Sequence, residues 1–193
     1  MPSTIERVTI VPPAPPSRPR LVLVPSRADH AVLDGGWWPR SGDPVAELPG
    51  LVLALAARFG PVRQLMLAST AWDRRFRRMA VGGGVVRMGW FASMDPALLI
   101  ATTDRGQQID LLVVPCDTAA SAAQAAMATA ANPTNVVRAP EILAMTVHTR
   151  PPAVDGRDLE PDAVRNNAGG HLADAPARRS GKSRSAAVSG GPG

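Results

Sequence analysis

Residues 76–91 decide the fold of this chain: Phe-Arg-Arg-Met-Ala-Val-Gly-Gly-Gly-Val-Val-Arg-Met-Gly-Trp-Phe. Two runs rich in apolar residues, 76–81 and 85–91, flank three consecutive glycines. Because glycine adopts positive φ without a steric penalty, the three glycines predict a tight turn between two antiparallel strands. Their spacing matches neither of the phosphate-loop patterns GxxxxGK[ST] and GxGxxG. The stretch therefore predicts a β-hairpin.

Further strands and two helices are predicted around this hairpin. One helix is expected to begin at Asp43 and Pro44, because Asp is a good N-cap and Pro suits the first helical position. Its apolar residues recur at helical spacing until Gly60. An alanine-rich helix is predicted over residues 118–131, where Asn-Pro follows it. The remaining predicted strands are residues 21–24, 62–69, 98–103 and 108–114.

These elements predict an α+β domain over residues 20–131. We expect a twisted, mainly antiparallel sheet of about five to six strands with two helices packed on one face. Residues 1–19 contain six prolines and are predicted to be a flexible, proline-rich arm. Residues 132–193 are rich in Pro, Gly, Ala and Arg and contain no aromatic residue. We expect them to form a disordered tail, with a short ordered piece at residues 142–147.

The chain has a high pI but a small net positive charge. The chain carries 21 Lys and Arg residues against 16 Asp and Glu, and its pI is about 11.1. Only Lys182 is a lysine, Tyr is absent and there is one Cys, so few groups titrate between neutral pH and the pKa of arginine. The high pI therefore reflects arginine usage, and not the strong positive field of a nucleic-acid-binding protein.

Several classes of protein and of site are not favoured. A single cysteine, Cys116, excludes a disulfide scaffold, and no apolar run reaches the roughly 18 residues of a membrane span. The N-terminal residues lack the pattern of a secretory signal, so we expect a cytoplasmic protein with no membrane contact. Cys116 has no CxxC partner, and His30, His148 and His171 are isolated, so no metal site and no cofactor are predicted.

The most unusual stretch is residues 34–41, Asp-Gly-Gly-Trp-Trp-Pro-Arg-Ser. Adjacent tryptophans in an extended chain point to opposite faces, so one can enter the core while the other lies near the surface. A following arginine can stack on a ring or hold an anion. The structural alternative is that the tryptophans anchor the core. The ligand-binding site predicted from this and similar Trp- and Arg-containing stretches consists of Trp38, Arg40, Trp72, Asp73 and Arg87.

The same stretches carry a resemblance to a known family. The string Gly-Trp-Trp-Pro-Arg-Ser at residues 36–41 is followed by Ala-Trp-Asp at 71–73, Val-Arg-Met-Gly-Trp-Phe at 86–91 and Leu-Leu-Val-Val-Pro at 111–115. In this order the motifs resemble a small actinobacterial family catalogued as a domain of unknown function. The resemblance covers residues 20–131 and implies no reaction, cofactor or partner.

Two classes of function are expected from these residues. We expect a non-catalytic module that binds a small anionic ligand or a protein partner at the Trp- and Arg-lined site. The alternative is an enzyme acting on a small polar or anionic substrate, with Asp73 as the base and Arg40 or Arg87 holding the anion.

A second alternative is weak, non-specific nucleic-acid binding through the arginines at residues 74–78. In a regular strand Arg75 and Arg77 would share one face, whereas Phe76 and Arg78 would share the other. The arginines are then divided between the two faces and Phe76 enters the core, so specific nucleic-acid binding is not favoured.

Overall fold

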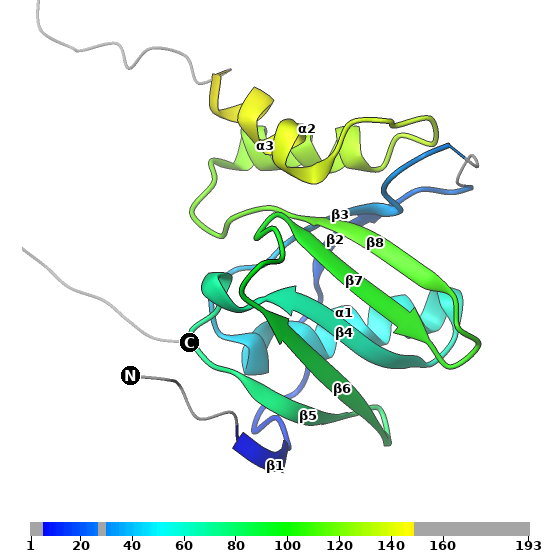
Figure 1. Cartoon of the computed structure of the whole chain (residues 1–193), viewed down its shortest axis with the longest axis vertical. Coiled ribbons are helices and arrows are strands. Elements are labelled where there is room, and N and C mark those ends of the chain that lie inside the picture. The colour runs from blue at the N-terminus through cyan, green and yellow to red at the C-terminus, as the bar shows by residue number, and fades with distance from the viewer. Residues whose placement is uncertain (1–5, 27–29, 149–193) are drawn as a thin grey trace, which may run out of the picture. The chain divides into compact units, whose positions relative to one another are not determined.

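The computed structural model of the chain describes residues 6–26 and 30–148, which form eight strands and three α-helices (Figure 1). The strands are β1 (Glu6–Ile10), β2 (Arg20–Leu23), β3 (Gly35–Trp38), β4 (Val62–Ala68), β5 (Phe76–Val81), β6 (Gly84–Phe91), β7 (Leu98–Thr103) and β8 (Gln108–Val113). The helices are α1 (Pro44–Phe59), α2 (Ala120–Ala130) and α3 (Ala139–His148), and a 3₁₀ turn covers Ser69–Ala71.

All eight strands belong to one sheet, in the order β1-β5-β6-β4-β7-β8-β3-β2. Three neighbouring pairs are parallel (β1 with β5, β4 with β6, and β3 with β8), whereas the other four pairs are antiparallel. The α+β class is confirmed, but the sheet is mixed and has more strands than the five to six predicted. Strands β1 and β3 were missed because β1 is short and next to a proline-rich segment, and Gly35–Trp38 has no alternation of apolar and polar residues.

The hairpin predicted over residues 76–91 is confirmed. Val81 pairs with Gly84 at the end of the β5–β6 ladder, and the two turn residues between them, Gly82 and Gly83, have φ of 58° and 80°. Only glycine adopts such φ values without strain, so the turn fixes the register of the whole hairpin.

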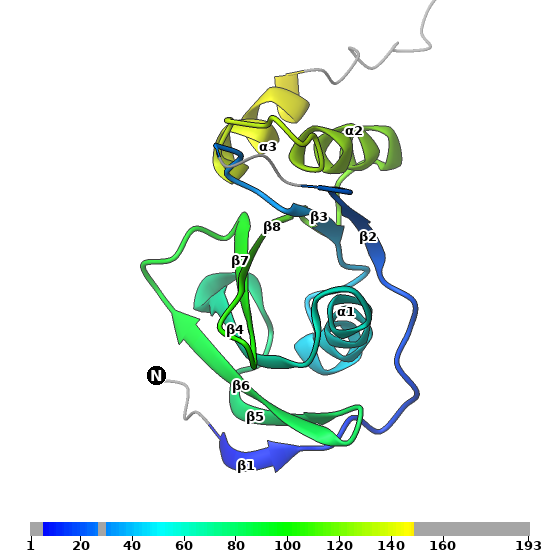
Figure 2. The ribbon, with the colours of Figure 1, turned by 90° about the vertical axis from the view of Figure 1, so that its right-hand side faces the viewer.

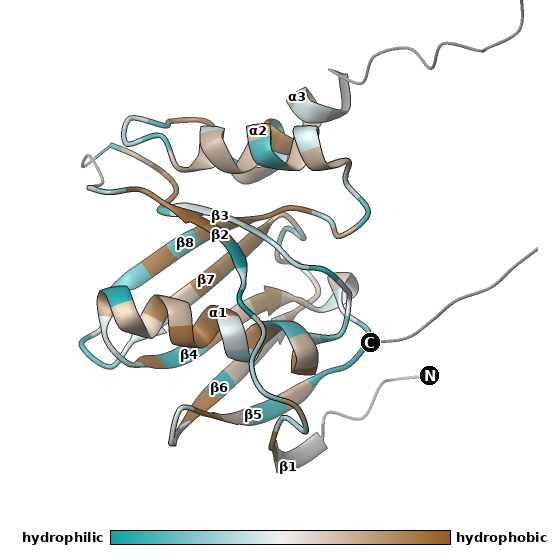
Figure 3. Ribbon diagram, turned by 180° about the vertical axis from the view of Figure 1, so that it is seen from behind, coloured by the Kyte–Doolittle hydropathy of each residue, from teal (hydrophilic) through white to brown (hydrophobic). Residues whose placement is uncertain are grey.

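Helix α1 begins and ends as its sequence predicts. The side chain of Asp43 accepts a hydrogen bond from the backbone N–H of Val45 at 3.0 Å, and Gly60 forms the C-cap with φ of 91°. The sheet curves around α1 (Figure 2), and the apolar stripe of the helix packs on the concave face. Figure 3 shows hydrophobic stretches of β7 and β8 behind α1. The largest fully buried residues of α1 are Leu48, Leu51 and Leu55.

Helices α2 and α3 pack on the opposite face of the sheet, so the prediction that the helices share one face is wrong. Residues 111–114 explain the difference, because this run of Leu and Val is buried on both sides of the sheet. Such a continuous apolar run is typical of a strand covered on both faces. Helix α2 lies directly on the backbone of β3, since a Cβ on Gly36 would be 2.8 Å from the Cα of Met127.

Two ordered segments lie outside the predicted domain limits. Within residues 1–19, strand β1 pairs in parallel with β5, and the chain then passes α1 to reach β2 at the other edge of the sheet (Figure 2). There the carbonyl oxygen of Ser17 occupies the place that a Cβ on Gly50 of α1 would need. Helix α3 falls within the predicted tail and includes the residues expected to form a short ordered piece. The rest of that tail, residues 149–193, lies outside the described residues.

Candidate functional site

The two adjacent tryptophans point to opposite faces of the sheet, as predicted, and both are buried. Trp37 faces α1 and stacks on Trp72, with ring centroids 5.6 Å apart and an angle of 14° between the planes. Trp38 faces α2 and is only 9% exposed. Its ring lies under the guanidinium of Arg20, whose central carbon is 3.3 Å from the ring centroid. Trp38 and Trp72 therefore belong to two cores on opposite faces and do not share a surface.

Two arginines, Arg20 and Arg40, join β2 and the segment before it to the end of β3. Arg20 donates through Nε to the carbonyl oxygen of Trp38 at 2.9 Å and through Nη2 to that of Pro39 at 2.6 Å. Burial, followed by the positive charge of Arg40, lowers the pKa of Arg20 from its ordinary value. Arg40 is exposed and donates to the carbonyl oxygen of Arg18 at 2.9 Å. Both arginines thus hold the segment that crosses α1 to the end of β3.

Asp73 lies near the start of α1, where its backbone takes part in a turn contact. Its backbone N–H donates to the carbonyl oxygen of Gly42 at 3.1 Å, and its exposed carboxylate lies about where a side chain on Gly42 would be. The local ion pair at the start of α1 joins Asp43 to Arg74, with 3.8 Å between Nε and Oδ1. The structure therefore brings Asp73 near the start of α1 and leaves its carboxylate in solvent.

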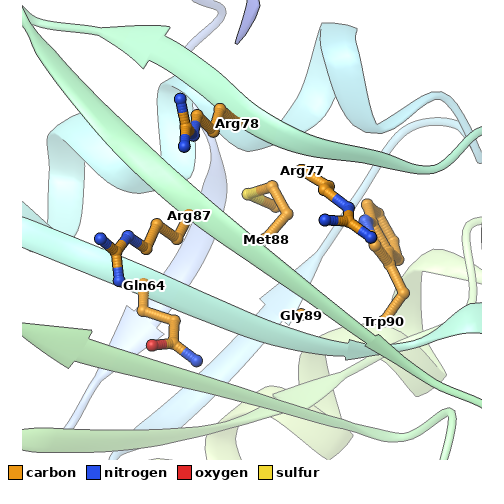
Figure 4. A pocket seen from close by; sticks show the side chains of 7 residues that line it. All are labelled: Gln64, Arg77, Arg78, Arg87, Met88, Gly89 and Trp90. Carbon is orange, nitrogen blue, oxygen red and sulfur yellow. The ribbon is translucent and has the colours of Figure 1, made fainter. Parts of the chain in front are cut away.

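Arg87 lies in a different place, in a groove on the face of the sheet that points away from α1. This arginine groove is an open depression of about 380 Å³ over strands β4, β5 and β6 (Figure 4). Neither Trp38, Arg40, Trp72 nor Asp73 lines it. Its lining residues are Gln64, Arg77, Arg78, Arg87, Met88, Gly89 and Trp90.

Strand register explains why three arginines gather there. Arg78 of β5 is directly opposite Arg87 of β6, and Arg87 is also the register partner of Gln64 on β4. The alternation of β5 breaks between Phe76 and Met79, which are three residues apart and both buried in the core next to α1. As a result, Arg77 and Arg78 are both exposed.

The division of the arginine run predicted from strict alternation is therefore wrong for Arg78. Arg75 donates to the carbonyl oxygen of Ser69 at 2.7 Å, whereas Arg78 lies with Arg77 in the groove. The prediction that Phe76 enters the core is confirmed, since it is 2% exposed. The sequence is sufficient to predict that Arg78 and Arg87 are paired, because both are equally far from the turn of the hairpin. Counting the register from the glycine turn is the signal that identifies this pair.

The three arginines of the groove have no acidic partner among the side chains that the structure describes. None of them makes a hydrogen bond or an ion pair with those side chains or with the described backbone. Like charges directly opposite each other on paired strands destabilise a sheet. A bound anion would remove this repulsion, because each guanidinium can donate two parallel hydrogen bonds to a carboxylate or a phosphate.

Trp90 and Gly89 also line the groove. Trp90 donates from Nε1 to the carbonyl oxygen of Phe76 at 2.6 Å, and the two rings meet edge to face with centroids 5.9 Å apart. Gly89 has no side chain, and the Phe91 ring leans over it, since a Cβ on Gly89 would be 2.9 Å from Cε2 of Phe91. The Trp90 N–H is already used within the sheet, so the guanidiniums and the Gln64 amide are the side-chain donors that remain in the lining.

The groups that line the groove are guanidiniums, an amide, a thioether and an indole. The lining contains no carboxylate, imidazole, thiol or hydroxyl group that could act as a base or nucleophile. Across the described part of the chain, no group of three or more His, Cys, Asp or Glu side chains is placed to hold a metal ion. The described helices also include none with the length and apolar character needed to cross a lipid bilayer.

Comparison with known proteins identifies a family. A model of a family of unknown function, DUF5994, matches residues 20–130. This range includes all of the arginine groove and ends before α3, and it begins at the first residue of β2, after β1. No curated protein and no solved structure matches the chain. Because the match covers more than half of its residues, the chain belongs to the DUF5994 family, a family of unknown function.

Proposed function

We propose that this protein is a non-catalytic module that binds an anionic ligand in the arginine groove. One observation carries the proposal: Arg78 and Arg87 are register partners on adjacent strands, and neither has an acidic partner among the described residues. Such a pair lowers the stability of the empty domain and gains most from a ligand that brings negative charge.

The geometry suits an oxyanion with several oxygens. Directly opposed residues on neighbouring strands lie about 5 Å apart at their Cα atoms, so two guanidiniums can reach one phosphate or carboxylate group together. The amide of Gln64, next to Arg87 on the other side, can donate to or accept from the same ligand. Arg77 extends the positive surface along the groove.

The alternative of an enzyme with Asp73 as base has less support. Asp73 is exposed and its backbone is held in a turn by Gly42, whereas Arg87 lies in a groove that includes neither Asp73 nor Arg40. A base and an anion holder must reach the same substrate.

Titration calorimetry with inorganic pyrophosphate at low salt tests the proposal. The doubly substituted R78Q/R87Q chain is expected to bind at least about tenfold more weakly than the wild type, because hydrogen bonds to charged groups are lost. The matched control is R18Q/R138Q, which removes the same charge from two exposed arginines that do not line the groove. Equal binding by both double variants would contradict the proposal.

A further inference from the structure

We infer that the anion is the backbone of a single-stranded nucleic acid, which crosses β6 from Arg87 to Phe91 and stacks a base on Phe91. The inference rests on the proposed function and names the ligand of the same groove.

Phe91 supplies the observation that a simple anion site would not need. Along β6 the residues Arg87, Gly89 and Phe91 alternate onto the face that points away from α1. Phe91 is 45% exposed, which makes it the aromatic side chain most open to solvent among those the structure describes. Its ring lies over Gly89, which lines the groove, so the aromatic surface continues the arginine surface.

Arginines beside an exposed ring match the needs of an unpaired strand. A nucleic-acid backbone presents phosphates at regular intervals, and unpaired bases stack on aromatic side chains whatever their sequence. Phe91 lies four positions after Arg87 on the same strand, a distance of about 13 Å that a few nucleotides can span. Arg78 lies opposite Arg87, and Arg77 adds a third cation to the groove.

Other polyanions fit this surface less well. An acidic peptide would use the arginines but would gain nothing particular from an exposed ring next to them. A duplex keeps its base faces stacked inside, so Phe91 could not reach them. The Phe91 ring and the Met66 side chain cover the backbone of Gly89, so a base would stack on the exposed side of the Phe91 ring.

Fluorescence anisotropy with a short, labelled oligothymidylate tests the inference on the full chain. Phe91→Ala is expected to weaken binding about five- to a hundredfold through loss of stacking, whereas Phe91→Tyr retains wild-type affinity. R78Q/R87Q should make the plot of log affinity against log salt shallower by about 1.4, the value for two phosphate contacts on a single strand. Met145→Ala, another exposed apolar side chain, on α3, is the control and should change nothing.

The outcomes separate this inference from the proposed function. Unchanged oligothymidylate affinity in F91A overturns the inference, even when pyrophosphate still requires Arg78 and Arg87 and the groove remains an anion site. Equal affinity for a duplex of the same length, or for polyglutamate, overturns it as well. If neither pyrophosphate nor the oligonucleotide binds, both fail. The basic residues at 178–184 are present in every variant, so differences between variants come from the groove.

Discussion

The sheet face that points away from α1 has two halves of opposite character. At β3 and β8 this face carries Trp38 and Leu112 and is covered by α2 and α3. At β4, β5 and β6 the same face carries Gln64, Arg78 and Arg87, and no described helix covers it (Figure 1). Side-chain alternation is the same in both halves, so it decides only which residues point outward.

What differs between the halves is the partner that each can accept. The covered half combines apolar side chains with the bare backbone of Gly36, and the alanines of α2 allow close approach. In the open half, a helix would bury guanidiniums without partners, which is expensive. The covered half is therefore a core, whereas the open half stays accessible to a charged ligand.

The largest effect is expected from Trp38→Ala in the covered half. Removing this buried ring should lower the free energy of unfolding by about 3–5 kcal/mol, as for other large-to-alanine changes in cores. Trp38→Phe is the control, because it keeps an aromatic ring under Arg20 and the indole N–H that it removes has no hydrogen-bond partner among the described residues. Urea unfolding followed by circular dichroism measures both variants, and a fully stable W38A would show that this half is not a core.

Gly36→Ala tests the close contact that seats α2. The new Cβ would lie 2.8 Å from the Cα of Met127, so the helix has to move, at an expected loss of about 1–3 kcal/mol in stability. Gly84→Ala, at the exposed turn of the β5–β6 hairpin, provides the comparison because its Cβ would meet only the carbonyl oxygen of Val81 at 3.7 Å. Equal unfolding midpoints for the two variants would contradict the close contact of α2 with β3.

Arg87→Glu should act in the opposite direction on stability and binding. Replacing the repulsive pair with an attractive Arg78–Glu pair is expected to raise the free energy of unfolding by about 0.5–1 kcal/mol at low salt. The gain should shrink at high salt, and pyrophosphate binding should be lost. Arg78→Glu should behave alike, whereas the double R78E/R87E chain should return to wild-type stability. Additive gains in the double variant would show that the two side chains do not interact.

Arg40→Ala is expected to have the smallest effect on stability and on binding, because Arg40 lies outside the arginine groove. Its one hydrogen bond, to the carbonyl oxygen of Arg18, is exposed, so stability should fall by about 0.5 kcal/mol or less. Pyrophosphate titration should give the wild-type affinity, because Arg40 does not line the groove. A tenfold loss of pyrophosphate affinity in Arg40→Ala would instead place the binding site near the end of β3.

Local signals in the sequence predict much of the fold. The cap at Asp43, the stop at Gly60 and the glycine turn of the hairpin all depend on neighbouring residues, and each is confirmed. Strand β3 and the side of the sheet that α2 covers could not be predicted in the same way, because they depend on the contact of Gly36 with a helix far along the chain.

In the candidate site, too, features set by local geometry can be predicted from the sequence, whereas features set by distant contacts cannot. The opposite orientation of Trp37 and Trp38 follows from strand geometry and could be predicted. The burial of Trp38 could not, since α2 and Arg20 cover it. The pairing of Arg78 with Arg87 in the groove can be predicted from the sequence only by counting the strand register from the glycine turn. The position of Arg77 cannot be predicted even in this way, because the alternation of β5 breaks between Phe76 and Met79.

The course of the first two strands has a consequence for how the protein is made. Strands β1 and β2 follow one another in the chain, yet they lie at opposite edges of the sheet with α1 between them. Glu6 pairs with Phe76, so β1 leaves the ribosome long before its partner strand exists. Pairings between strands far apart in the chain form late in folding. The helix α1 and the central strands must therefore form before β1 can pair with β5.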